Sequence, residues 1–131
     1  MRPDTRNWMA SAEYDVETAR HLLATGRYLY VVFMCHLALE KILKALAGEA
    51  LGRLAPRTHD LIFLARTAGV SPPQEHMDFI GRINAASIPT RYPEDLDRAV
   101  AAYPRAVAEE YLTKTREVIA WLKSDPRLQG S

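Results

Sequence analysis

The stretch from Arg27 to Ala47, RYLYVVFMCHLALEKILKALA, constrains the fold of this chain more than any other segment. It contains no Pro or Gly, and its first half is apolar on every side of a helical wheel. A helix that is apolar all round is buried all round, rather than packed on one face. The stretch therefore predicts a central helix that the remaining helices surround.

Polar residues within this helix form one stripe. His36, Glu40 and Lys44 are spaced by four residues and share a face, whereas Lys41 points about 100° away. Buried ionisable groups need partners, so we expect side chains of another helix or another subunit to meet them. The stripe is then either a functional site or a bonded structural network. As a functional site, it could include His36 and Glu40 as half of the ligands of a metal.

Helical periodicity predicts three further long helices and a short one. In the first, Trp8, Ala12, Val16, Ala19 and Leu23 share a face. We expect Asp4 or Thr5 to cap this helix, Thr58 or a neighbour to cap the short one, and Ser71 to cap the fourth, followed by Pro at its start. The predicted ranges are about 5–25, 61–67, 72–84 and 104–123.

Between Ala85 and Tyr103 the periodicity fails and Pro89 and Pro93 interrupt the chain, which predicts a long loop with one turn of helix near 95–101. No segment has the pattern of a strand. The expected fold is all-α, an antiparallel up-and-down bundle of four main helices plus a short helix, with a long loop before the last helix. We expect one domain over residues 1–131 with its core at about 5–123, and a frayed SDPRLQGS tail.

Composition limits the classes of function. Apolar residues make up 48% of the 131 residues and the formal net charge is +1, so an extended basic surface for nucleic acid is not expected. Most of the positive charge is Arg, which suits local phosphate recognition. The single Cys35 excludes an intrachain disulfide, and no leader or long apolar run is apparent, so we expect a cytoplasmic protein. No motif for a metal or a cofactor is present, and none is expected.

Two further patches have the chemistry of a nucleotide site. His59 and Asp60 lie at a helix N-terminus, where backbone N–H groups hold anions. The segment Thr90–Pro93, TRYP, places the guanidinium of Arg91 beside the ring of Tyr92. The structural alternatives are that His59 caps its helix and that Arg91 and Tyr92 pin a loop onto the bundle.

The order of these features resembles the HEPN domain (higher eukaryotes and prokaryotes nucleotide-binding). The resemblance covers about Trp8 to Trp121, nearly the whole chain. Its most specific piece is ALEKILKA within the central helix, and the other parts follow in order: Trp8 with Asp15 and Ala19, Gly26–Tyr28, Phe33, Thr58–Leu61 and Thr90–Pro93.

The resemblance implies a helical bundle that forms a homodimer. Bacterial and archaeal members are often encoded beside a minimal nucleotidyltransferase, in a two-gene module of the toxin–antitoxin type. It therefore implies a subunit that binds a nucleotide or that partner. The residues expected to do so are Glu40, Lys44, His59, Arg91 and Tyr92, with Arg91 and Lys44 on phosphate and Tyr92 on a base or ribose.

Some HEPN proteins are metal-independent ribonucleases with an Arg followed by His after four to six residues, late in the bundle. Here Arg91 is followed at those positions by Leu96, Asp97 and Arg98. The spacing occurs from Arg53 to His59, ahead of the short helix, so catalysis is not the favoured expectation. A ribonuclease toxin using His59 with Arg53 or Arg91, and a purely structural dimerisation subunit, are the alternatives.

Overall fold

The computed structural model describes residues 1–130, which form seven α-helices, one 3-10 helix and no strand. The all-α prediction is confirmed. In chain order the elements are α1 (Pro3–Ala24), α2 (Tyr28–Leu51), α3 (Leu61–Ala68), α4 (Gln74–Ala85), α5 (Ser87–Arg91), α6 (Leu96–Ala102), α7 (Arg105–Lys123) and η1 (Pro126–Leu128).

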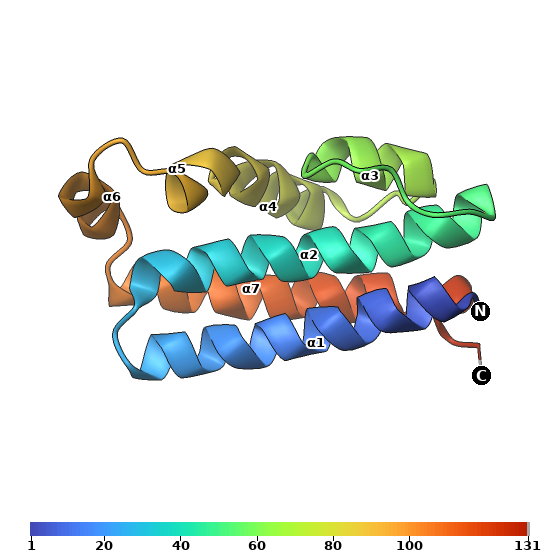
Figure 1. Cartoon of the computed structure of the whole chain (residues 1–131), viewed down its shortest axis with the longest axis horizontal. Helices are drawn as coiled ribbons and strands as arrows, with labels where there is room; N and C mark the ends of the chain where they lie inside the picture. Colours follow the sequence, from blue (N-terminus) through green and yellow to red (C-terminus); the bar gives the residue numbers. More distant parts are fainter. Residues whose placement is uncertain (131) are drawn as a thin grey trace.

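Helix α2 is the centre of the bundle, as its composition predicts. No side chain from Val31 to Gly48 is exposed, and α2 contacts every other helix of the described chain. The long helices α1 and α7 pack on one side of α2, and α3, α4 and α5 follow one another along the opposite side (Figure 1). The first and last described residues lie at the same end of the bundle, and α6 lies at the other end.

The N-terminus of α1 differs from the prediction. Neither Asp4 nor Thr5 caps the helix, because it already begins at Pro3, whose fixed φ and missing N–H suit the first helical position. The Thr5 hydroxyl instead donates to Glu49 Oε2 over 2.5 Å, and the Arg2 N–H donates to the same oxygen over 2.9 Å. Polar groups at the start of α1 therefore tie it to the last turns of α2.

The cap of α3 also lies two residues later than predicted. Asp60 is the N-cap, and its carboxylate accepts from the N–H groups of Ile62 and Phe63. Thr58 precedes it and accepts from the Asp60 N–H over 3.1 Å. Helix α4 begins after Pro73, which is its N-cap, so Ser71 does not cap it as predicted; the helix buries Ile80 and Ile83.

The long loop predicted before the last helix contains two short helices. In α5, Pro89 is the third residue, where its missing N–H breaks no bond of the first turn, and the Thr90 hydroxyl donates to the Ala86 carbonyl over 2.7 Å. Asp95 caps α6, which matches the predicted helical turn near 95–101. No residue of α6 is buried, so this helix lies on the bundle as an outer layer.

Within the tail predicted to fray, Pro126–Leu128 form η1, and Ser131 lies outside the described residues. Leu128 is buried in the core, and the Arg127 guanidinium donates to the Ala68 carbonyl at the end of α3 over 2.7 Å. A single apolar residue among polar ones carries no periodicity, which is why the sequence pattern does not reveal this contact.

Candidate functional site

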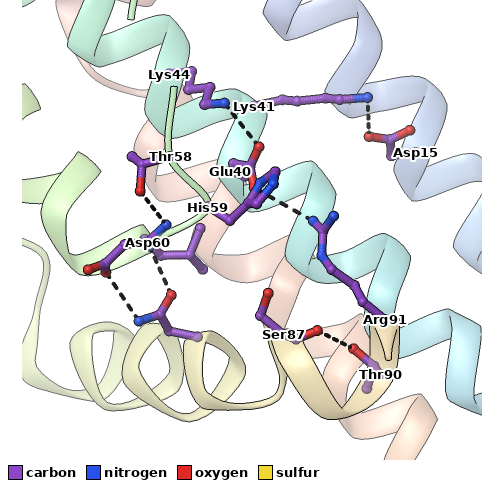
Figure 2. Close-up of polar contacts among 12 residues, drawn as sticks. Asp15, Glu40, Lys41, Lys44, Thr58, His59, Asp60, Ser87, Thr90 and Arg91 are labelled. Carbon is purple, nitrogen blue, oxygen red and sulfur yellow. Dashed lines mark hydrogen bonds and ion pairs between the residues drawn. The ribbon is translucent and has the colours of Figure 1, made fainter. Parts of the chain in front are cut away.

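The polar stripe of α2 lies inside the protein. His36, Glu40 and Lys44 are 0%, 3% and 8% exposed. Lys41 points to a different side of α2, toward α1, where its amino group lies 2.7 Å from an Asp15 oxygen (Figure 2). The charge of Lys41 is therefore neutralised within the α1–α2 hairpin. The buried polar side chains of the stripe need partners from other parts of the chain.

Glu40 lies at the centre of the polar cluster that surrounds the stripe, and contacts Lys44, His59 and Arg91. One carboxylate oxygen, Oε2, lies 3.1 Å from Lys44 Nζ one turn along α2. The other, Oε1, lies 2.7 Å from Nδ1 of His59, in the connection before α3. The same Oε1 is 3.7 Å from Nη2 of Arg91, the last residue of α5 (Figure 2). One carboxylate thus faces two cations and an imidazole from three parts of the chain.

The guanidinium of Arg91 contacts an aromatic ring, but two of its nitrogen atoms make no hydrogen bond within the protein. Its Cζ lies 4.7 Å from the centre of the Phe33 ring, an arrangement that favours the cation. Yet Nε and Nη2 are buried and make no hydrogen bond to any described residue. These two atoms form one edge of the planar guanidinium, the fork that binds phosphate or carboxylate in a bidentate manner. Buried donors without a hydrogen bond are rare in folded proteins, and an anion that reaches them would supply the missing acceptor.

His36 lies deeper, one turn before Glu40. Both ring nitrogens are buried without a hydrogen bond to a described residue. Burial is the main cause that lowers the pKa of His36 to about 4, and the positive charge of Arg91 acts in the same direction. The imidazole is therefore neutral near pH 7 and leaves the positive charge of the cluster to Arg91 and Lys44.

An open pocket of about 350 Å³ gives solvent access to the cluster. The connection before α3, the end of α4 and helix α5 provide its walls, with His59 and Arg91 on different walls. The His59 side chain is 63% exposed and Tyr92 is 74% exposed, so both face the solvent. The pocket is lined by Thr58, His59, Asp60, Asn84, Ser87, Ile88, Arg91 and Tyr92.

Comparison with known families decides the assignment of the fold. The profile of the HEPN domain matches residues 5–125. The chain belongs to the HEPN domain family. Comparison with curated proteins finds no match.

Solved structures of similar fold agree with this membership. The HEPN chain is 27% identical to TT1696 from Thermus thermophilus, with a TM-score of 0.79 over 93% of this chain and 98% of that one. ST0689, an archaeal HEPN homologue, is 24% identical, with a TM-score of 0.73 over 94% of this chain and 97% of that one. The second similarity concerns the fold alone.

In this HEPN domain the N-terminus of α3 is not a free anion site, contrary to the expectation from sequence. The Leu61 N–H donates to the Asn84 side chain over 2.9 Å, and the next two N–H groups donate to Asp60. The capping carboxylate also places negative charge where an anion would bind. An anion in this pocket must therefore be held by side chains.

The structure brings Glu40, Lys44, His59, Arg91 and Tyr92 to one pocket or to the cluster beneath it, whereas Arg53 is exposed just after α2 and does not line that pocket. Sequence reasoning missed Asn84 and Ser87, which also line it. Neither belongs to a recognisable motif, because each acquires its place only when α4 and α5 pack beside α3.

Residues 1–130 contain no group of three or more His, Cys, Asp or Glu side chains placed to hold a metal ion. Among the same residues, no helix combines the length and apolar character that crossing a bilayer requires.

Proposed function

We propose that this HEPN protein is a homodimeric subunit that binds a nucleotide through its phosphate, and that it works in a two-gene, toxin–antitoxin type module with a minimal nucleotidyltransferase. The observation that carries the binding proposal is that Arg91 lines a solvent-open pocket while its Nε and Nη2 donors make no hydrogen bond to a described residue, although Nη2 lies 3.7 Å from Glu40. A turn of the guanidinium toward the pocket would let a phosphate accept from both donors at once.

The other residues of the cluster have distinct roles in this proposal. His59 donates a hydrogen bond to the phosphate, and Tyr92 packs on the base or ribose. Glu40 orients Arg91 and Lys44 through the contacts described above. The Lys44 side chain is only 10% exposed and forms an ion pair with Glu40, so it neutralises that carboxylate and weakens its repulsion of the phosphate rather than contacting the phosphate directly. Because Tyr92 is largely exposed, its side chain is free to move as the ligand enters, whereas Nδ1 of His59 is held by Glu40 over 2.7 Å.

Titration of a fluorescently labelled nucleotide tests the binding proposal. Loss of a bidentate charged contact weakens binding by about 10- to 100-fold, which is the effect expected for Arg91→Ala. Arg105→Ala is the matched control, because Arg105 is an exposed residue of α7 that pairs with Glu109 one turn away. Equal affinity of wild type and Arg91→Ala contradicts the role of Arg91. A wild type that binds no nucleotide leaves only the partner-binding part of the proposal.

The assembly part of the proposal is tested separately. Light scattering of the purified chain is expected to give twice the 14.8 kDa mass of one subunit. Co-expression with the product of the neighbouring gene is expected to yield a stable complex when that gene encodes a minimal nucleotidyltransferase. A monomer at micromolar concentration, or separation of the two proteins on a sizing column, argues against this part.

A ribonuclease is the second candidate, and the position of His59 favours it. The exposed imidazole and the Arg91 guanidinium line the same pocket, which is the pairing needed for a general acid or base and for stabilising a charged phosphorane. Arrest of growth on expression that His59→Ala abolishes supports this function. Growth arrest that persists in that variant removes His59 from catalysis.

A further inference from the structure

A second pocket adjoins the one that contains Arg91. It is an open groove of about 440 Å³ between α5, the connection after it and α6. Its walls are mainly apolar, whereas the Arg91 pocket is rimmed by polar side chains. The apolar residues that line the groove are Ile88, Pro89, Tyr92, Pro93, Ala99 and Ala102.

The two pockets are adjacent and share two lining residues. Ile88 and Tyr92 line both of them, and these side chains are 71% and 74% exposed. A molecule anchored at Arg91 therefore reaches the groove by passing one pair of side chains. No residue of α6 is buried, so this helix adds little to the core while it supplies a wall of the groove.

The residues that line the groove suit a flat heterocycle. Proline rings, alanine methyl groups and the Tyr92 ring offer apolar surfaces for stacking, and base–aromatic stacking tolerates any base. The exposed Glu94 and Arg98 also line the groove and present an acceptor and donors to the polar edge of a ring. An aliphatic ligand would use neither of these charges.

We infer that the groove between α5 and α6 binds the base of the nucleotide whose phosphate lies at Arg91, with Tyr92 between the two subsites. This inference rests on the proposed function and adds to it the place of the base. It predicts that affinity depends on the heterocycle, in addition to the phosphate, and that filling the groove removes that dependence.

The test compares AMP with ribose 5-phosphate, which shares the sugar phosphate and lacks the base. We expect wild type to bind AMP about 5- to 100-fold more tightly than ribose 5-phosphate, because stacking contributes to AMP alone. Ala99→Gln, which fills the groove, is expected to bring AMP down to the affinity of ribose 5-phosphate and to leave the latter unchanged. Ala102→Gln fills the groove from an exposed position and provides a second variant with the same expected result.

Ala101→Gln is the control, because Ala101 lies on the same helix and does not line the groove. Equal affinity of wild type for the two ligands overturns the inference and leaves the phosphate site intact. Unchanged AMP affinity in both groove variants also overturns it. If wild type binds neither ligand, the proposed nucleotide binding fails as well, so the two failures are distinguishable.

Discussion

Folding disfavours the protonated form of His36. Its pKa is lowered to about 4, mainly by burial, whereas an unfolded chain has a histidine pKa of about 6.5. Between these values the unfolded chain binds more protons than the folded one, so stability falls as the pH falls. The loss begins near pH 6.5, is complete near pH 4 and amounts to about 3 kcal/mol. Glu40 on α2, Arg91 on α5 and His59 before α3 are the charged or titratable groups that act on this imidazole.

Urea unfolding of wild type and His36→Leu at a series of pH values measures this effect. The free energy of unfolding of wild type is expected to fall between pH 6.5 and 4 relative to that of the variant. The lowered pKa values of Glu49, Glu110 and Asp125 affect both proteins equally and act at lower pH. Parallel curves for the two proteins would show that His36 is protonated with its ordinary pKa.

Glu40 is the residue on which the cluster depends. Glu40→Gln keeps the size of the side chain and removes the charge that faces Lys44 and Arg91. Removing one partner of a buried ion pair costs about 3–5 kcal/mol, so we expect a loss of that size in the free energy of unfolding. Glu109→Gln, on the exposed face of α7, is the control and is expected to change it by less than about 1 kcal/mol. A loss in Glu40→Gln no larger than in the control would mean that water, rather than Glu40, satisfies the two cations.

The purely structural alternative makes the same prediction for stability and a different one for binding. In that case Glu40→Gln is less stable, but neither wild type nor Arg91→Ala binds nucleotide. Stability and affinity measured on the same variants therefore separate a scaffold from a site.

Among the elements, α3 depends on one capping side chain. Asp60 accepts two backbone N–H groups of the first turn and contacts the Asn84 amide of α4. Asp60→Ala is expected to lower the free energy of unfolding by about 1 kcal/mol, because these donors lose their acceptor. Asp60→Asn keeps an acceptor and is expected to lie within about 0.5 kcal/mol of wild type. Equal losses in the two variants would show that the charge, rather than the cap, stabilises α3.

Sequence periodicity was sufficient for the elements that pack by one apolar face. Helices α1, α4 and α7 were predicted close to their observed bounds because their buried residues recur with the helical period, whereas α2 was predicted from its long apolar run without Pro or Gly. The elements missed are those that lack such a face. Helix α5 contains Pro89, and η1 contributes only Leu128 to the core, so the spacing of apolar residues predicts neither helix.

The candidate site shows the same limit. The motif positions Glu40, His59 and Arg91 are recognisable in the sequence, because charged residues stand out within an apolar frame. The geometry is not recognisable: Glu40 meets the other two only through the packing of α5 and the α2–α3 connection against α2. The occupied N–H groups of α3 were likewise mispredicted, since the acceptor from Asn84 comes from another helix.

At the scale of the whole molecule, the central position of α2 predicts cooperative unfolding. Trp8 of α1 and Trp121 of α7 pack against the same core, so neither helix has a hydrophobic interior of its own. We expect urea transitions followed by far-ultraviolet circular dichroism and by tryptophan fluorescence to coincide. If the chain is a homodimer, as proposed, the common midpoint rises with protein concentration because association stabilises the folded state.

Variants with one tryptophan make this test specific to each side of the bundle. Trp8→Phe leaves Trp121 to report on α7, and Trp121→Phe leaves Trp8 to report on α1. Because both rings pack against the shared core, we expect the fluorescence midpoint of each variant to equal its own midpoint by circular dichroism. A fluorescence transition of Trp121 that precedes the loss of helix would mean that α7 separates first. In that case α2 would hold α1 and the α3–α5 layer together without it, and the stability measured for Glu40→Gln would report on that smaller unit.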